Sequence, residues 1–193
     1  KNPMGICWSD GALYVAETGE HQILRIADGV KIVFAGNGEE EFLVKYEPDE
    51  EVTIQPDSDL FRFGRVAFSP ENATGSELSV KSLTRSYGEP SYRGKLELIC
   101  SDNGIVIVNE LSLEEYLYSV VPSEMPTGYP DGALQAQAIG ARTYAYQHME
   151  HAAYPQYGAH LDDSTAYQVY NNVEENENTT LAVRESYGKL LYT

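Results

Sequence analysis

The sequence predicts an α+β fold, in which an antiparallel, β-rich N-terminal part precedes a helical lobe built around one long alanine-rich helix. Three observations support this prediction. Short apolar runs separated by Gly, Asn and Asp turn residues fill residues 1–110, which is typical of strands joined by tight turns. From residue 112 onward, capping patterns and apolar residues three or four apart indicate helices. No apolar run approaches the roughly 18 residues of a membrane-spanning helix.

Composition narrows the classes of function. The chain has 193 residues, 42% of them hydrophobic, which suits one domain or two small ones. It carries 30 acidic and 13 basic residues, for a net charge of −17. Such a charge repels phosphates and anionic lipids, so nucleic acid and membrane surfaces are excluded as primary partners. A solvated surface is the simplest explanation of the acidity.

The N-terminal region, residues 1–76, is expected to be β-rich. Strands are predicted at residues 12–16, 23–26 and 30–34, joined by Asp-Gly turns into an antiparallel meander. The run GICWSDGALYVAETGEHQILRI and the following AGNG resemble one NHL repeat, a β-propeller blade covering residues 1–38. A single blade cannot bury both of its faces alone. Acidic loops follow, and the strands predicted among them are at residues 42–46, 52–54 and 61–68.

The second region, residues 77–193, changes from strands to helices. Strands are predicted at residues 78–80, 95–100 and 105–108. Ser112 followed by Glu115 forms a capping-box pattern, so a helix should start there, and Pro122 should end it. The long helix should run from about Pro130 to His151, with a buried stripe of Leu134, Ala138, Ala141 and Ala145. The last elements predicted are a short strand at 167–170, a helix at 179–185 and the start of a strand at 189–193.

Glu124 is the strongest candidate for chemistry, because it lies in a proline-bracketed turn after two valines. A carboxyl group in apolar surroundings is harder to ionise, so its pKa rises. A raised pKa suits a general acid near neutral pH, and protonation of the leaving oxygen begins glycosidic cleavage. The alternative is an ordinary surface residue in a turn.

Other candidate residues lie on the long helix. Arg142 shares a face with Gln135 and Tyr146 and could orient a carboxylate or a sugar hydroxyl, although from the residues alone a solvated arginine paired with an acid is the better explanation. His148 and His151, with His160, give a weak metal-binding pattern. Exposed histidines at a helix end are common, so no metal is predicted.

Long motifs in residues 77–193 carry a family resemblance. The segments are YRGKLELI, IVNELSLEEYLYSVVPSEMP, ALQAQAIGARTYAY, DDSTAYQVY and AVRESYGKLLY. They resemble the stage II sporulation protein D family, whose domain is also called SpoIID/LytB. Their length makes the resemblance far more specific than any short motif.

The resemblance implies a bacterial, extracytoplasmic cell-wall enzyme, a lytic transglycosylase acting in sporulation, at the engulfment step. Such enzymes cut peptidoglycan glycan strands after N-acetylmuramic acid and leave a 1,6-anhydro end. The expected partners are therefore glycan strands and other cell-wall hydrolases of sporulation. The resemblance places catalytic roles on Glu124 and Arg142, and substrate binding on Gln135, Gln168 and Tyr170. One carboxyl group can serve as acid and then as base, so a second catalytic carboxylate is not required.

The chain departs from the family pattern in three places. Gln135 stands where the family usually has lysine, which removes a cation. Some relatives bind zinc through cysteine near the DDST loop, but this chain has no cysteine there, so no cofactor is expected. The family domain continues beyond the last motif, so the domain is expected to be C-terminally incomplete and its activity weak. The alternative function is a non-catalytic peptidoglycan-binding module or an amidase enhancer of the LytB type.

Overall fold

The structure is a computed structural model that describes most of the chain. It gives the backbone of the strands at residues 5–9, 12–17, 22–27 and 30–35, and describes residues 51–58, 60–61, 64–70 and 76–192. The chain divides into two compact units, Lys1–Thr53 and Ile54–Thr193. The division falls earlier in the sequence than the expected boundary after residue 76.

The first unit is a four-stranded antiparallel sheet in the order β1-β2-β3-β4. Its strands are β1 (Gly5–Ser9), β2 (Ala12–Glu17), β3 (Gln22–Ala27) and β4 (Val30–Ala35). The predicted meander is therefore confirmed, and β1 precedes the three predicted strands. Propeller blades are also four-stranded sheets, but the NHL resemblance stays a prediction.

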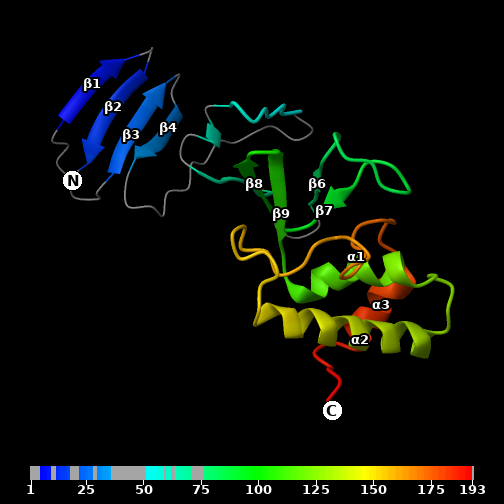
Figure 1. Cartoon of the computed structure of the whole chain (residues 1–193). Helices are drawn as coiled ribbons and strands as arrows, with labels where there is room; N and C mark the ends of the chain where they lie inside the picture. The colour runs from blue at the N-terminus through cyan, green and yellow to red at the C-terminus, as the bar shows by residue number, and fades with distance from the viewer. Residues whose placement is uncertain are drawn as a thin grey trace. The chain divides into compact units, whose positions relative to one another are not determined.

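Two small antiparallel sheets open the second unit (Figure 1). The larger one has the order β5-β8-β9, with β5 (Val66–Phe68) paired to β8 (Lys95–Ser101) and β8 paired to β9 (Gly104–Glu110). The smaller one pairs β6 (Leu78–Ser79) with β7 (Ser91–Tyr92). The pairing of β5 with β8 explains why residues before 76 belong to this unit.

Several predicted strands are shorter than expected or missing. Among the described residues of the segment 61–68, Val66–Phe68 form a strand, and residues 52–54 form none. Residues 42–46 lie outside the described residues. The segments 167–170 and 189–192 are also not strands, because no neighbouring strand pairs with them.

Helix α1 (Leu113–Glu124) begins with the predicted capping box. The Ser112 side chain accepts a hydrogen bond from the Glu115 backbone N–H at 3.3 Å, and the Glu115 carboxylate accepts one from the Ser112 N–H at 3.4 Å. The prediction that Pro122 ends the helix is wrong. The Met125 N–H still bonds to the Val121 carbonyl at 3.0 Å, so helical bonding continues past the proline. Glu124 is consequently the last residue of α1 and does not lie in a turn.

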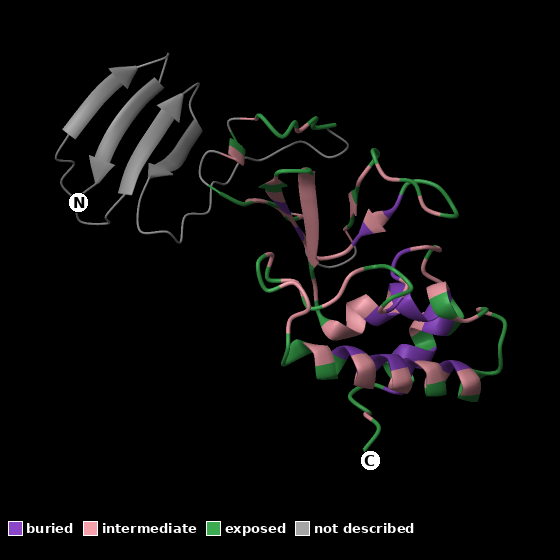
Figure 2. Cartoon of the chain, in the orientation of Figure 1, coloured by how far each residue is buried: buried purple, intermediate pink, exposed green. Residues whose placement is uncertain are grey.

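Helices α2 (Asp131–Met149) and α3 (Glu177–Glu185) pack with α1 into the helical lobe. Figure 2 shows the buried residues on the helix faces that meet. The predicted stripe of α2 is confirmed, since Leu134, Ala138, Ala141 and Ala145 are all at most 3% exposed. Three alanines in this stripe let neighbouring helices approach the α2 backbone closely. In the described part of the chain, no helix combines the length and hydrophobicity needed to cross a membrane.

Candidate active site

Glu124 projects from the C-terminal end of α1 toward two hydrogen-bond donors. The backbone N–H of Val169 donates to its Oε1 at 3.2 Å, and Nε2 of Gln137 donates to its Oε2 at 3.0 Å. Each carboxylate oxygen therefore has one neutral donor. One donor comes from the loop that follows α2 and the other from α2 itself.

The electrostatic surroundings of Glu124 favour the protonated carboxyl. Partial burial raises the pKa of Glu124 above its usual value, while the hydrogen bonds from Val169 and Gln137 pull it down less strongly. The C-terminal end of a helix also disfavours negative charge. The residue as a whole is exposed, so its carboxyl is accessible to a substrate while its two oxygens lie against protein donors. Neither a cation nor a second carboxylate of the described part contributes to this shift.

The loop donor is held in place by its two neighbours, Gln168 and Tyr170. Gln168 is 5% exposed, accepts a hydrogen bond from the Tyr116 hydroxyl at 3.2 Å, and donates to the Ala141 carbonyl at 3.4 Å. The Tyr170 hydroxyl donates to Asn109 Oδ1 at 2.6 Å, and its ring stacks on Tyr116 with centroids 5.2 Å apart. These two anchors fix the backbone on either side of Val169, whose N–H donates to Glu124.

Gln168 and Tyr170 were predicted to bind substrate, but the structure gives them a different position. Both side chains are buried, and burial raises the pKa of the Tyr170 hydroxyl far above its usual value. They contact the Glu124 site through the backbone between them and not through their own side chains. Their side-chain hydrogen bonds hold the backbone on both sides of Val169.

The structure does not bring Arg142 to Glu124. Its guanidinium is buried and forms a bidentate pair with Glu114, from Nε to Oε1 at 2.7 Å and from Nη2 to Oε2 at 2.9 Å. It also donates to the Val183 and Lys189 carbonyls, each at 3.2 Å. The predicted contact with a sugar is not available to a residue that is 1% exposed. Arg142 instead ties α1, α2, α3 and the C-terminal segment together.

Gln135 also lies apart from Glu124, because its Nε2 donates to Oε2 of Glu185 on α3 at 2.7 Å. The amide that reaches Glu124 belongs to Gln137, two residues along α2, which sequence reasoning missed. The sequence does contain a signal for the position of Gln137, since Gln137 is three residues after Leu134 and four before Ala141. This spacing places Gln137 beside the buried stripe that faces α1.

The first histidine of the weak metal pattern, His148, has other contacts. The Nδ1 of His148 lies 2.9 Å from the Tyr144 carbonyl, and its ring packs against Tyr144 and Tyr167. Within residues 51–58, 60–61, 64–70 and 76–192, no three His, Cys, Asp or Glu side chains form a group able to hold a metal ion.

A family model matches the part of the chain that holds this site. The SpoIID family model, described as stage II sporulation protein, matches residues 101–192. An uncharacterized protein of Brachyspira hyodysenteriae is 42% identical over 84 residues, which cover 44% of this chain and 23% of that protein. The amidase enhancer of Bacillus subtilis is 40% identical over 75 residues, covering 39% and 10% of the two chains. Stage II sporulation protein D of Bacillus amyloliquefaciens is 42% identical over 67 residues, which cover 34% of this chain and 20% of that protein.

The matched segments thus span less than a quarter of the length of these relatives. No solved structure matches the chain. The family match includes Glu124, both of its hydrogen-bond donors and the buried Arg142. Residues 101–192 of this chain are therefore similar to the stage II sporulation protein D family.

Proposed function

We propose that this protein is a lytic transglycosylase that cleaves peptidoglycan glycan strands on the extracytoplasmic side of a bacterial membrane, in sporulation. The observation that carries the proposal is the state of Glu124. Its carboxyl is accessible, has a raised pKa and is hydrogen-bonded by neutral donors alone. A carboxyl group in this state is better suited than a freely solvated one to give a proton and then to take one back.

The proposed reaction uses Glu124 twice. Its protonated carboxyl gives the proton to the glycosidic oxygen as the bond from C1 of the muramyl sugar to that oxygen breaks. The resulting carboxylate then removes the proton from the 6-hydroxyl of the same sugar, whose oxygen forms the new bond to C1. The product is a 1,6-anhydro end, and Glu124 is protonated again. Enzymes that add water instead use a pair of carboxyl groups, which this intramolecular route does not need.

The donors of Glu124 support both halves of this cycle. A hydrogen bond to a carboxylate stabilises the ionised form, so the Val169 N–H and Gln137 stabilise Glu124 after it has given its proton. Partial burial acts in the opposite direction and keeps the acid form available at the start. Arg142, Gln168 and Tyr170 contribute by fixing the elements that carry Glu124 and its donors.

A second candidate function is supported by one comparison. The amidase enhancer of Bacillus subtilis is 40% identical to this chain over 75 residues. A protein with that role would bind the wall and stimulate a separate amidase, without cutting glycan itself. In both candidates the partners are glycan strands and other cell-wall hydrolases, and no cofactor is required.

The test is release of anhydromuramyl fragments from peptide-free glycan strands, followed by mass spectrometry. Glu124→Gln is expected to lower the release rate about 100- to 10,000-fold, because the amide cannot donate the required proton. Glu150→Gln is the matched control, since Glu150 is an exposed acid at the end of α2, and it should release fragments like the wild type. Equal release by Glu124→Gln and the wild type would refute the proposed acid. Stimulation of an amidase by a wild type that releases no fragments would establish the second candidate instead.

A further inference from the structure

The last turn of α1 presents two consecutive polar side chains to the loop that follows α2. Glu124 accepts a hydrogen bond from the Val169 N–H at 3.2 Å, and the Ser123 hydroxyl oxygen accepts one from the Asn172 N–H at 3.1 Å. Both donors are backbone groups, three residues apart in the same loop. The reaction proposed for Glu124 gives no role to Ser123, so the second hydrogen bond needs its own explanation.

The Ser123 hydroxyl is oriented by a bond within its own helix. It donates to the Ser119 carbonyl, one turn earlier in α1, at 2.6 Å. Serine and threonine side chains in helices often make this local bond. A hydroxyl group has one proton and two lone pairs, so the bond to Ser119 uses its only proton and leaves a lone pair for the Asn172 N–H. Ser123 is therefore fixed as an acceptor for the loop.

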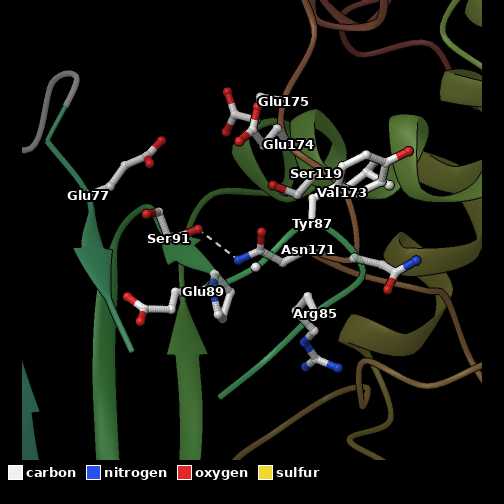
Figure 3. A pocket seen from close by; sticks show the side chains of 13 residues that line it. Glu77, Arg85, Tyr87, Glu89, Ser91, Ser119, Asn171, Val173, Glu174 and Glu175 are labelled. Carbon is white, nitrogen blue, oxygen red and sulfur yellow. Dashed lines mark hydrogen bonds between the residues drawn. The ribbon is translucent and has the colours of Figure 1, made fainter. Parts of the chain in front are cut away.

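The loop turns toward Ser123 at Asn171. The φ angle of Asn171 is 53°, in the left-handed region that asparagine adopts more readily than most other residues. Its side chain is held on the opposite side of the loop, because Nδ2 donates to the Ser91 carbonyl of β7 at 2.7 Å. Figure 3 shows this hydrogen bond as a dashed line. The backbone that leads to the Asn172 N–H is thus anchored before it meets α1.

The same pair of hydrogen bonds occurs a second time, on α2. The Thr143 hydroxyl donates to the Ile139 carbonyl one turn earlier at 2.7 Å, and it accepts a bond from the Leu191 N–H at 2.9 Å. Thr143 thereby fastens the C-terminal segment to α2, and neither of its bonds involves Glu124 or the loop of residues 168–172. The chain therefore contains a matched comparison for Ser123, with the same chemistry at another place.

We propose that Ser123 is a positioning residue, whose hydroxyl holds the loop of residues 168–172 against the end of α1 so that the Val169 N–H stays on the Glu124 carboxyl. Three residues span at most about 10 Å, so the attachment at Asn172 limits how far Val169 can move. The consequence for cleavage rests on the proposed function, whereas the positioning itself does not.

The pKa of Glu124 reports whether the Val169 N–H is in place. Burial raises this pKa, and the bonds from Val169 and Gln137 lower it, so a weaker bond from Val169 leaves it higher. The groups that face Glu124 from α2 and from the loop, the Gln137 amide and the Val169 N–H, carry no charge. On α1, burial and then the charge of Glu124 raise the pKa of the Tyr116 hydroxyl far above its usual value, so Tyr116 stays neutral while Glu124 titrates.

The test measures the Glu124 pKa by NMR of its carboxyl carbon in the whole chain, together with hydrogen exchange of the Val169 and Asn172 amides. In Ser123→Ala, both amides are expected to exchange about 2- to 10-fold faster, because each depends on a bond of ordinary strength. The pKa of Glu124 should rise in the same variant. Ser123→Thr retains the hydroxyl and should restore both readouts. Alanine favours a helix at least as well as serine, so Ser123→Ala should keep its fold.

Thr143→Val is the matched control, since it removes the hydroxyl that makes the same two bonds on α2. It should leave the Glu124 pKa and the exchange of the Val169 amide unchanged. A shift in Thr143→Val as large as in Ser123→Ala would mean that the lobe loosens as a whole, and would overturn the proposal. Unchanged values in Ser123→Ala, or a failure of Ser123→Thr to restore them, would overturn it as well.

These readouts do not depend on cleavage. If the wild type releases fragments and Ser123→Ala shows no shift in the Glu124 pKa, the positioning role alone is refuted. If Ser123→Ala shows the shift and the wild type releases no fragments, the proposed function alone is refuted. Where both hold, the alkaline limb of the pH–activity profile should move to higher pH in Ser123→Ala and return in Ser123→Thr.

Discussion

Helix α1 carries a glutamate near each end, and the two have opposite surroundings. Glu114, in the first turn, has a side chain 19% exposed and a bidentate pair with the buried guanidinium of Arg142. Glu124, the last helical residue, is exposed and receives one neutral hydrogen bond on each oxygen. The helix dipole adds to the contrast, because it favours an acid at the N-terminal end and disfavours one at the C-terminal end.

The different surroundings of Glu114 and Glu124 indicate which of the two carboxyl groups is suited to transfer a proton. Both carboxylate oxygens of Glu114 already accept hydrogen bonds from the Arg142 guanidinium, which is a fixed positive charge. Glu114 is therefore suited to hold elements together, whereas Glu124 is suited to acid–base chemistry. The three predictions below test this division of roles.

The largest effect on stability is expected for Glu114→Gln. It leaves the buried guanidinium of Arg142 without a counter-charge, and removing one partner of a buried ion pair costs about 3–5 kcal/mol of folding free energy. Chemical denaturation followed by circular dichroism measures this loss. Glycan cleavage per folded molecule should fall much less than in Glu124→Gln.

The control is Glu110→Gln, which removes a glutamate whose side chain is 65% exposed and which pairs with Lys95 at 2.7 Å. An exposed pair contributes at most about 1 kcal/mol. If the two variants lost the same stability, the structural role assigned to the pair of Glu114 and Arg142 would be refuted.

A smaller effect, measured in the pH profile, is expected for Gln137→Leu. The Gln137 amide stabilises ionised Glu124, so its removal should raise the pKa of Glu124 further. The acid form is needed at the start of the reaction, and activity falls as pH rises through this pKa. The alkaline limb of the pH–activity profile should therefore move to higher pH.

Gln135→Leu is the matched control on the same helix, because the Gln135 amide bonds to Glu185. Gln135→Leu should leave the pH of the alkaline limb unchanged. A shift of the limb in Gln135→Leu and none in Gln137→Leu would mean that the wrong amide has been assigned to the site.

The local features of the helical lobe could be predicted from sequence. The capping box of Ser112 and Glu115 and the stripe that includes Leu134 and Ala145 depend on residues within a few positions of one another. The predicted end of α1 is wrong because a proline two residues before the end of a helix removes only one helical hydrogen bond. The assignment of Glu124 as the site residue came from the length of the motif and not from its local properties.

The partners of the site could not be predicted, because they join residues distant in sequence. Arg142 pairs with a residue 28 positions earlier, and Glu124 receives its backbone donor from a residue 45 positions later. Helical spacing indicates which residues share a face, but not which element that face meets. Gln135 and Gln137 show the consequence, since both are glutamines on α2 and each bonds to a different helix.

The smallest effect is expected for the stability of Glu124→Gln, and its sign separates the two glutamates most clearly. Because the pKa of Glu124 is raised in the folded protein, the native state holds this proton more tightly than the unfolded chain does. The stability that the proton provides is present at low pH and is lost as pH rises from the unfolded pKa through the folded one. At neutral pH, the variant should therefore match or slightly exceed the wild type, within about 0.5 kcal/mol as for most surface substitutions. Its advantage should shrink as the pH is lowered in a denaturation series. A variant less stable than the wild type at neutral pH would show that ionised Glu124 stabilises the fold, as the ion pair of Glu114 does.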